Sequence, residues 1–168
     1  MRRFATLLFA IVAATAPAWA QDDVKATILK HLKVSRDFTL KVADQMPESS
    51  YNFKLTPPQM TFAQQMVHLS QNLSEFMAPF SGQQPTGAKP ASMNKNDVIA
   101  FMTKSFDDAI QQVSKLTPEQ ISKAYDSGEG KMTGLELLLE MLDHTTHHRA
   151  SAEMYLRAKG ITPTEYEF

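Results

Sequence analysis

The fold of this chain is decided by residues 133–160, which read TGLELLLEMLDHTTHHRASAEMYLRAKG. Apolar residues recur in this stretch every three or four positions, which is the spacing of one face of an α-helix. Thr133 and Glu136 form a capping box at its start, and Gly160 supplies the left-handed residue at which helices commonly end. We therefore expect one long helix from Thr133 to Lys159.

Three further segments of similar length have the same periodicity, and Pro and Gly residues separate them. They span about Asp23 to Gln45, Thr61 to Met77 (before Pro79) and Asn94 to Lys115. A short extra helix starts at Thr117-Pro118, and the Ser127–Gly130 stretch ends it. No stretch has a convincing strand alternation. The pattern predicts an all-α fold, a four-helix bundle with a short extra helix before the last long helix.

The composition fits one globular domain and narrows the chemistry. The chain has 168 residues, and its 17 Lys and Arg nearly balance its 18 Asp and Glu. This length can bury a proper core, and the charge balance excludes a general nucleic-acid binder. The absence of cysteine excludes disulfides, thiolate zinc sites, iron–sulfur clusters and cysteine nucleophiles. Any metal must therefore be held by the five histidines and by carboxylates.

The first twenty residues have the layout of a secretory signal peptide. Met1-Arg2-Arg3 is basic, Phe4 to Ala14 is almost entirely apolar, and Ala18-Trp19-Ala20 is a small-x-small cleavage pattern. The alternative is an uncleaved membrane anchor, but the apolar run is shorter than the roughly 18–20 residues that span a bilayer. We therefore expect residues 1–20 to be removed. Residues 21–168 should form a mildly acidic domain, periplasmic or secreted, with no stable membrane anchor.

Three histidines lie in the last helix, but they do not share a face. Side chains four residues apart stand above one another, so His144 and His148 can chelate one cation. At about 100° per residue both fall within the apolar arc, whereas His147 falls on the charged face between Glu136 and Glu140. Inward imidazoles must be hydrogen-bonded or metal-bound. Helix geometry alone leaves two interpretations open, a metal site or two core histidines that neighbouring side chains satisfy.

A metal would need a third ligand from another helix, and His31 and His68 are available. His31 lies on the apolar stripe of the first helix, one heptad from both Val24 and Phe38. His68 lies about 100° away from the stripe of its own helix, nearer the polar face. Periodicity alone therefore favours His31.

The sequence resembles the DinB-like superfamily over essentially all of residues 21–168. The similarity lies in Leu142–Arg149, Tyr155–Arg157, Gly160–Pro163, Met46–Tyr51, Thr56-Pro57 and Thr61–His68. Members are four-helix bundles, often dimers, that bind a divalent metal through three histidines. The resemblance therefore implies a site made of His68, His144 and His148, and it implies a homodimer. Zinc and nickel both suit imidazole ligands. The chain departs from many members at Ala150 and Ser151, where those members have Gly-Gln.

A three-histidine site with an open fourth position is typical of a catalytic metal centre. If the protein is an enzyme, the sequence favours a metal-dependent hydrolase that acts on an unknown small molecule. A non-catalytic metal-binding stress protein and a pure interaction bundle are the alternatives. A thiol-dependent transferase or isomerase, which the family includes, is less favoured in an exported chain. No acidic residue of the last helix falls inward beside its histidines, which counts against hydrolysis.

Two more residues of the last helix bear on the chemistry. Arg149 lies on the apolar arc, and we expect it to form a structural ion pair rather than to act in catalysis. Tyr155 is either a hydrogen-bond donor to a metal ligand or a core tyrosine.

Export can be tested by mass. Cleavage after Ala20 removes Trp19, the only tryptophan, so the processed protein should lack tryptophan fluorescence. Intact-mass measurement on protein from the extracytoplasmic fraction should give a chain that begins at Gln21. A mass that still includes Met1 would mean that the apolar run is an anchor.

Overall fold

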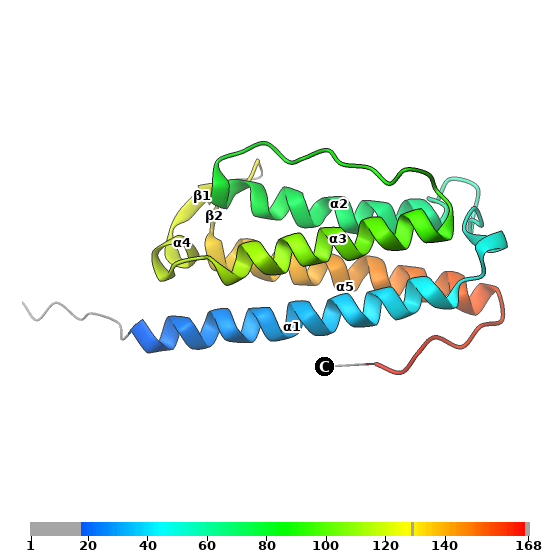
Figure 1. The fold of residues 1–168 in the computed structure, drawn as a ribbon, viewed down its shortest axis with the longest axis horizontal. Coiled ribbons are helices and arrows are strands. Elements are labelled where there is room, and N and C mark those ends of the chain that lie inside the picture. Colours follow the sequence, from blue (N-terminus) through cyan, green and yellow to red (C-terminus); the bar gives the residue numbers. More distant parts are fainter. Residues whose placement is uncertain (1–17, 129, 167–168) are drawn as a thin grey trace, which may run out of the picture.

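The computed structural model describes residues 18–128 and 130–166, and it confirms the four-helix bundle (Figure 1). The short helix expected before the last long one is also present. The elements are α1 (Ala18–Gln45), a 3₁₀ turn (Glu48–Ser50), α2 (Phe62–Ser81), α3 (Lys95–Ser114), α4 (Pro118–Ser122), β1 (Ala124–Asp126), β2 (Lys131–Thr133) and α5 (Gly134–Ala158). Residues 1–17 of the expected signal peptide lie outside the described residues.

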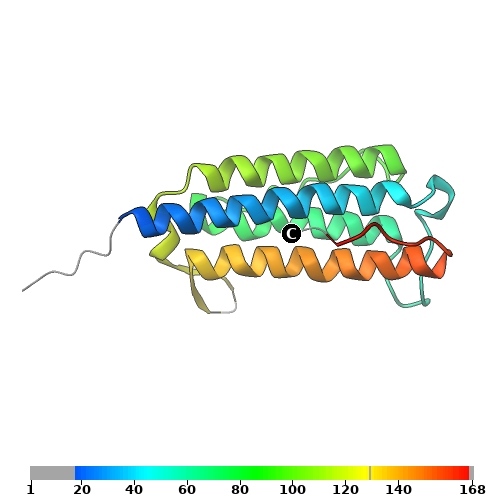
Figure 2. The same ribbon diagram turned by 90° about the horizontal axis from the view of Figure 1, so that it is seen from below.

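The four long helices are not arranged in their chain order. α1 and α5 run in one direction and α2 and α3 in the other, as Figures 1 and 2 show. α2 packs against α3 and α5, and α1 packs against the same two helices. Residues 82–94 therefore return along the whole length of the bundle, the long crossover that some bundles contain. As a result, α5 has α2 on one side and α1 on the other.

The starts of α2, α3, α4 and α5 and the end of α5 lie where the capping residues predict them, whereas α1 begins at Ala18, earlier than the expected Asp23. Thr61, Thr117 and Thr133 each accept a hydrogen bond from the backbone N–H three residues later, and each completes a capping box. Asn94 caps α3 through the same kind of bond. Gly160, just past α5, has a φ of 74°. Each N-cap contributes about 1 kcal/mol, so local sequence fixes the start of α2, α3 and α5.

The expected end of α2 was wrong. The helix does not stop near Met77 but continues through Pro79 to Ser81. A proline lacks the N–H that would bond the preceding turn, and this normally ends a helix. Here Pro79 lies in the last turn, where only one backbone bond is lost. Phe80 beyond it is held against the ring of Tyr125, with 5.0 Å between the ring centroids.

A small hairpin stands where no strand was expected. β1 and β2 pair antiparallel, with Ala124 opposite Thr133. Ser127, Gly128 and Gly130, from the stretch expected only to end the short helix, follow β1 and precede β2, and the Ser127 N–H donates to the Gly130 carbonyl. Each strand has three residues, which is too few for an alternation to be recognised.

The apolar stripes of the helices meet in one core. Ile28, Phe38 and Val42 of α1 are buried, as is Met46 just after its end, and Val24 at the start of the stripe is half-buried. The five stripe positions of α3 are also buried. Within the described part of the chain, no helix combines the length and apolar character that a membrane span requires.

Candidate metal centre

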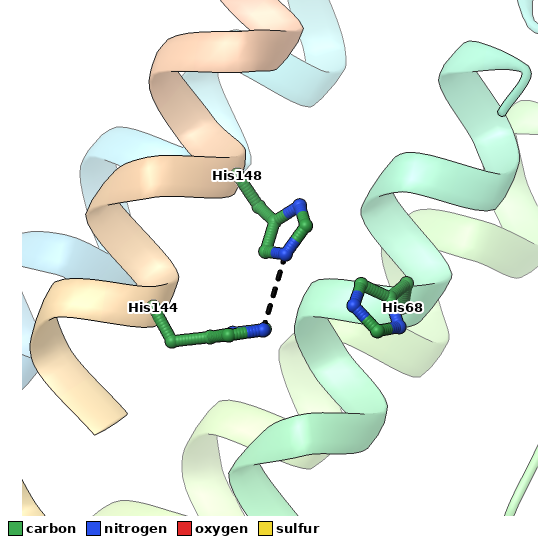
Figure 3. A group of neighbouring side chains, drawn as sticks. All are labelled: His68, His144 and His148. Atoms are coloured by element: carbon green, nitrogen blue, oxygen red, sulfur yellow. Dashed lines mark hydrogen bonds between the residues drawn. The ribbon is translucent and has the colours of Figure 1, made fainter. Parts of the chain in front are cut away.

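Three histidines from two helices meet between α2 and α5 (Figure 3). His68 projects from α2, and His144 and His148 project towards it from successive turns of α5. One ring nitrogen of each lies within 4.8 Å of the nitrogens of the other two. Among the described residues, no other three His, Asp or Glu side chains converge in this way. The structure therefore brings together the three residues that the family resemblance implies.

The spacing of these imidazoles fits a divalent cation. Ligand nitrogens around a tetrahedral zinc ion lie about 3.3 Å apart, because each Zn–N bond is about 2.0–2.1 Å long. The Nε2 atoms of His144 and His148 are 3.1 Å apart. The His68 ring centroid lies 4.6 Å from that of His148 and 5.4 Å from that of His144. All three side chains are half-buried, so the group is partly shielded from water.

Two amide side chains of α2 contact these rings, and the sequence interpretation missed both. Gln65 Nε2 lies 2.6 Å from His148 Nδ1, and Asn72 Nδ2 lies 2.5 Å from His144 Nε2. Gln65 and Asn72 are buried, whereas most amides are exposed. They stand three residues before and four residues after His68, on its side of the helix. Two polar residues at this spacing from a histidine are the signal that could have identified them.

The Gln65 contact controls which nitrogen of His148 has a lone pair. When the Gln65 amide group donates to Nδ1, the proton of the neutral ring is on Nε2, which then cannot bind a metal. A half-turn of the amide puts its carbonyl oxygen against a protonated Nδ1 and leaves the lone pair on Nε2. Partners of this kind orient metal-ligating histidines and fix their tautomer.

Burial keeps two of the imidazoles neutral. The pKa of His148 is lowered to about 4, first by burial and then by the neighbouring His144, His68 and His147. The pKa of His144 is also lowered, first by burial and then by His68 and His147. Neutral imidazole is the form that binds a metal, so both rings are in the binding form at neutral pH.

The burial of the histidines agrees with the helical periodicity in α5 but not in α1. His147 is exposed, in contrast to His144 and His148. His31, which periodicity alone favoured as the third ligand, is exposed and does not belong to the group. It lies at the edge of the α1 stripe, where the space against α5 is a hollow rather than packed core.

Tyr155 and Arg149 both take structural positions. The Tyr155 hydroxyl donates to the Met60 carbonyl at 2.6 Å, so this residue is a core tyrosine and not a donor to a ligand. Arg149 is buried, and its guanidinium donates to Ser35 Oγ and covers the ring of Phe38. The ion pairs of the described residues do not include Arg149, so the expected ion pair is not found among them.

A hollow of about 430 Å³ opens beside His144. Phe76 and Leu137 give it apolar walls, and the Phe76 ring lies 5.7 Å from the imidazole of His144. Glu75 from α2 and Glu140 from α5 also line it. The sequence missed both acidic residues. Glu75 lies on α2, about which the helical positions of α5 contain no information. Glu140 was assigned to the charged face of α5, and it reaches the hollow from that exposed face.

Comparison with known proteins agrees with this architecture. The family model described as "DinB family" matches residues 20–168. The uncharacterized protein YjoA of Bacillus subtilis (strain 168) is 23% identical over 146 residues, covering 80% of this chain and 90% of YjoA. The crystal structure of the DinB-like YjoA from Bacillus subtilis has a TM-score of 0.73 at 20% identity, covering 83% of this chain and 96% of that one. A DinB-like protein from Bacillus cereus ATCC 10987 gives 0.72 at 18% identity, with 84% and 97% covered. At these identities, the two structures establish a common fold.

The lowered pKa of His148 predicts that the metal-free protein loses stability in acid. The folded-state pKa of about 4 lies below the ordinary value of 6.5, so the unfolded chain binds more protons between these pH values. The free energy of unfolding should therefore fall as the pH drops from about 6.5 to about 4. Urea unfolding with a chelator at several pH values measures this dependence. His148→Gln should flatten it, and His31→Gln, at an exposed position, should not. An equally steep loss in His148→Gln would contradict the assignment.

Proposed function

The chain belongs to the DinB family, and from this premise we propose that it binds a divalent metal through His68, His144 and His148. The observation that carries the proposal is the convergence of three imidazoles from two helices within 4.8 Å. The lowered pKa values of His144 and His148 support it, since deprotonated rings need no proton release to bind. Zinc and nickel both fit this ligand set.

We further propose that the metal centre is hydrolytic. A divalent cation held by His68, His144 and His148 would supply Lewis-acid chemistry at this site. The hollow beside His144 would take a small-molecule substrate, with Phe76 and Leu137 limiting the access of water to it. Glu75 and Glu140 are the side chains of this hollow that can accept a proton and return it.

The competing function is metal binding at the same three histidines without catalysis. A metal-binding stress or interaction protein needs the three histidines but no proton acceptor, so the role of Glu75 and Glu140 distinguishes it from a hydrolase. A thiol-dependent transferase or isomerase is less favoured. We propose an exported location on the pattern of residues 1–20, and low-molecular-weight thiols are scarce outside the cytoplasm. A homodimer is proposed from the family resemblance alone.

Metal content tests the ligand set. His68→Ala, His144→Ala and His148→Ala should each lose most of the metal bound to the untagged protein, because two imidazoles hold a cation more weakly than three. His147→Ala and His31→Ala, which remove exposed rings, should keep it. Atomic emission spectroscopy after dialysis gives the metal per chain. If His31→Ala emptied the site and His68→Ala left it full, the proposed ligand set would be wrong.

The same variants provide a stability control. A metal that bridges α2 and α5 only in the folded state raises the melting temperature, so a chelator should lower it for the wild type. The melting temperature of His144→Ala, followed by circular dichroism, should not respond to the chelator.

Hydrolysis can be separated from metal binding. Metal-loaded wild type should hydrolyse p-nitrophenyl acetate faster than His148→Ala, and the double variant Glu75→Gln/Glu140→Gln should lower kcat by about 10²-fold or more, the usual contribution of a general base. Its metal content should stay full. Asp108→Asn, on α3, is the matched control for loss of a carboxylate. Full metal content without any wild-type turnover would exclude the hydrolase and favour the non-catalytic function.

A further inference from the structure

A second hollow lies on the other side of α5, against α1, and a buried arginine lines it. Its volume is about 300 Å³. Arg149 follows His148 directly in the sequence, but one step along a helix turns a side chain by about 100°. Arg149 therefore faces α1, whereas His148 faces α2. Figure 2 shows α1 and α5 side by side, with the C-terminal segment running along them.

The guanidinium of Arg149 has more donors than acceptors around it. Nη1 donates to Ser35 Oγ at 3.0 Å, and Nη2 donates to Thr146 Oγ1 at 3.4 Å. The ring centroid of Phe38 lies 4.4 Å from Arg149 Cζ. The ring contacts the face of the guanidinium, so it accepts none of the N–H groups, which point outward in the guanidinium plane. A guanidinium carries five N–H donors. Arg149 is only 4% exposed, so water compensates little of its charge.

No carboxylate of the described residues forms an ion pair with this buried charge. Asp143 and His31 also line the hollow, and both are exposed. The carboxylate of Asp143 therefore lies at the water-exposed rim, where solvent and salt screen its charge, whereas the guanidinium lies inside. Burial lowers the pKa of Arg149, and the nearby Tyr166 and Glu153 only partly offset this. A buried cation with no carboxylate at ion-pair distance is unfavourable, and an anion that entered the hollow would relieve this.

The rest of the lining indicates what kind of anion fits. Val34, Leu139 and Leu142 are apolar, and Leu139 is 47% exposed at the opening. The planar guanidinium matches a carboxylate with two parallel hydrogen bonds, and the hydroxyls of Ser35 and Thr146 can turn to donate to the same group. A small hollow with apolar walls and one buried charge favours an anion with one charge and an apolar body.

We propose that the hollow between α1 and α5 binds a small monocarboxylate with a short apolar body. The carboxylate accepts hydrogen bonds from Arg149, and the body lies against Leu139 and Leu142. This site uses none of the three histidines and does not depend on the proposed metal.

Calorimetric titration of benzoate into the full chain tests the site, with a chelator present so that no metal contributes. Benzoate should bind saturably, and benzamide, which has the same shape without the charge, should not. Arg149→Met should weaken the binding of benzoate by about 10–100-fold, the effect of losing a charge-assisted bidentate contact. Arg157→Met removes an exposed arginine of the same helix and should change nothing.

Two further variants keep the test independent of folding. Leu139→Asp leaves Arg149 in place and adds a negative charge at an exposed rim position, so it should also weaken the binding of benzoate. His144→Ala alters the histidine group and should bind benzoate like the wild type. Circular dichroism checks that each variant is folded. Binding of benzoate no tighter than that of benzamide, or binding that persists in folded Arg149→Met, would overturn the proposal, as would loss of binding in folded His144→Ala.

Discussion

Neutral imidazoles enclosed between two helices need polar partners, and this requirement organises the centre of the bundle. His144 and His148 point from α5 towards α2, and both rings are half-buried. α2 supplies the partners from its own buried positions, Gln65 and Asn72, together with the third imidazole of His68. Any of these groups left without a partner would cost about 1–3 kcal/mol, so α2 and α5 have to stay in this register.

The rest of the fold fixes that register. The long crossover of residues 82–94 makes α2 and α5 neighbours, although two other helices lie between them in the sequence. At the start of α5, Gly134 lies against the backbone of α4, and a Cβ there would collide with the carbonyl oxygen of Gln120. The capping box of Thr133 begins the helix at the same point. The position of His144, ten residues further on, is therefore fixed by contacts at the end of the bundle.

The two sides of α5 have different chemistry because adjacent positions on a helix face different neighbours. Towards α2 the helix presents neutral imidazoles beside a hollow with two carboxylates. Towards α1 it presents a buried cation beside a hollow with apolar walls. His148 and Arg149 are consecutive residues, yet the first contacts Gln65 and the second contacts Ser35. The proposed cation site and the proposed anion site can therefore share one helix without bringing their charges together.

The sequence by itself determined the helices and their inward faces, because both depend on local contacts. Capping residues such as Thr61 and Thr133 act on the next turn, and a step of about 100° per residue separates His147 from His148. Only the tertiary structure decided what those faces meet. The placement of His68, rather than His31, beside His144 and His148 depends on which helix lies opposite, and periodicity could not give it, although the family resemblance implied it. The buried amide of Gln65 and the approach of Glu75 depend on the same neighbour. Apolar periodicity identifies the buried face of each helix from that helix alone. It contains no information about which neighbouring helix covers the edge of that face.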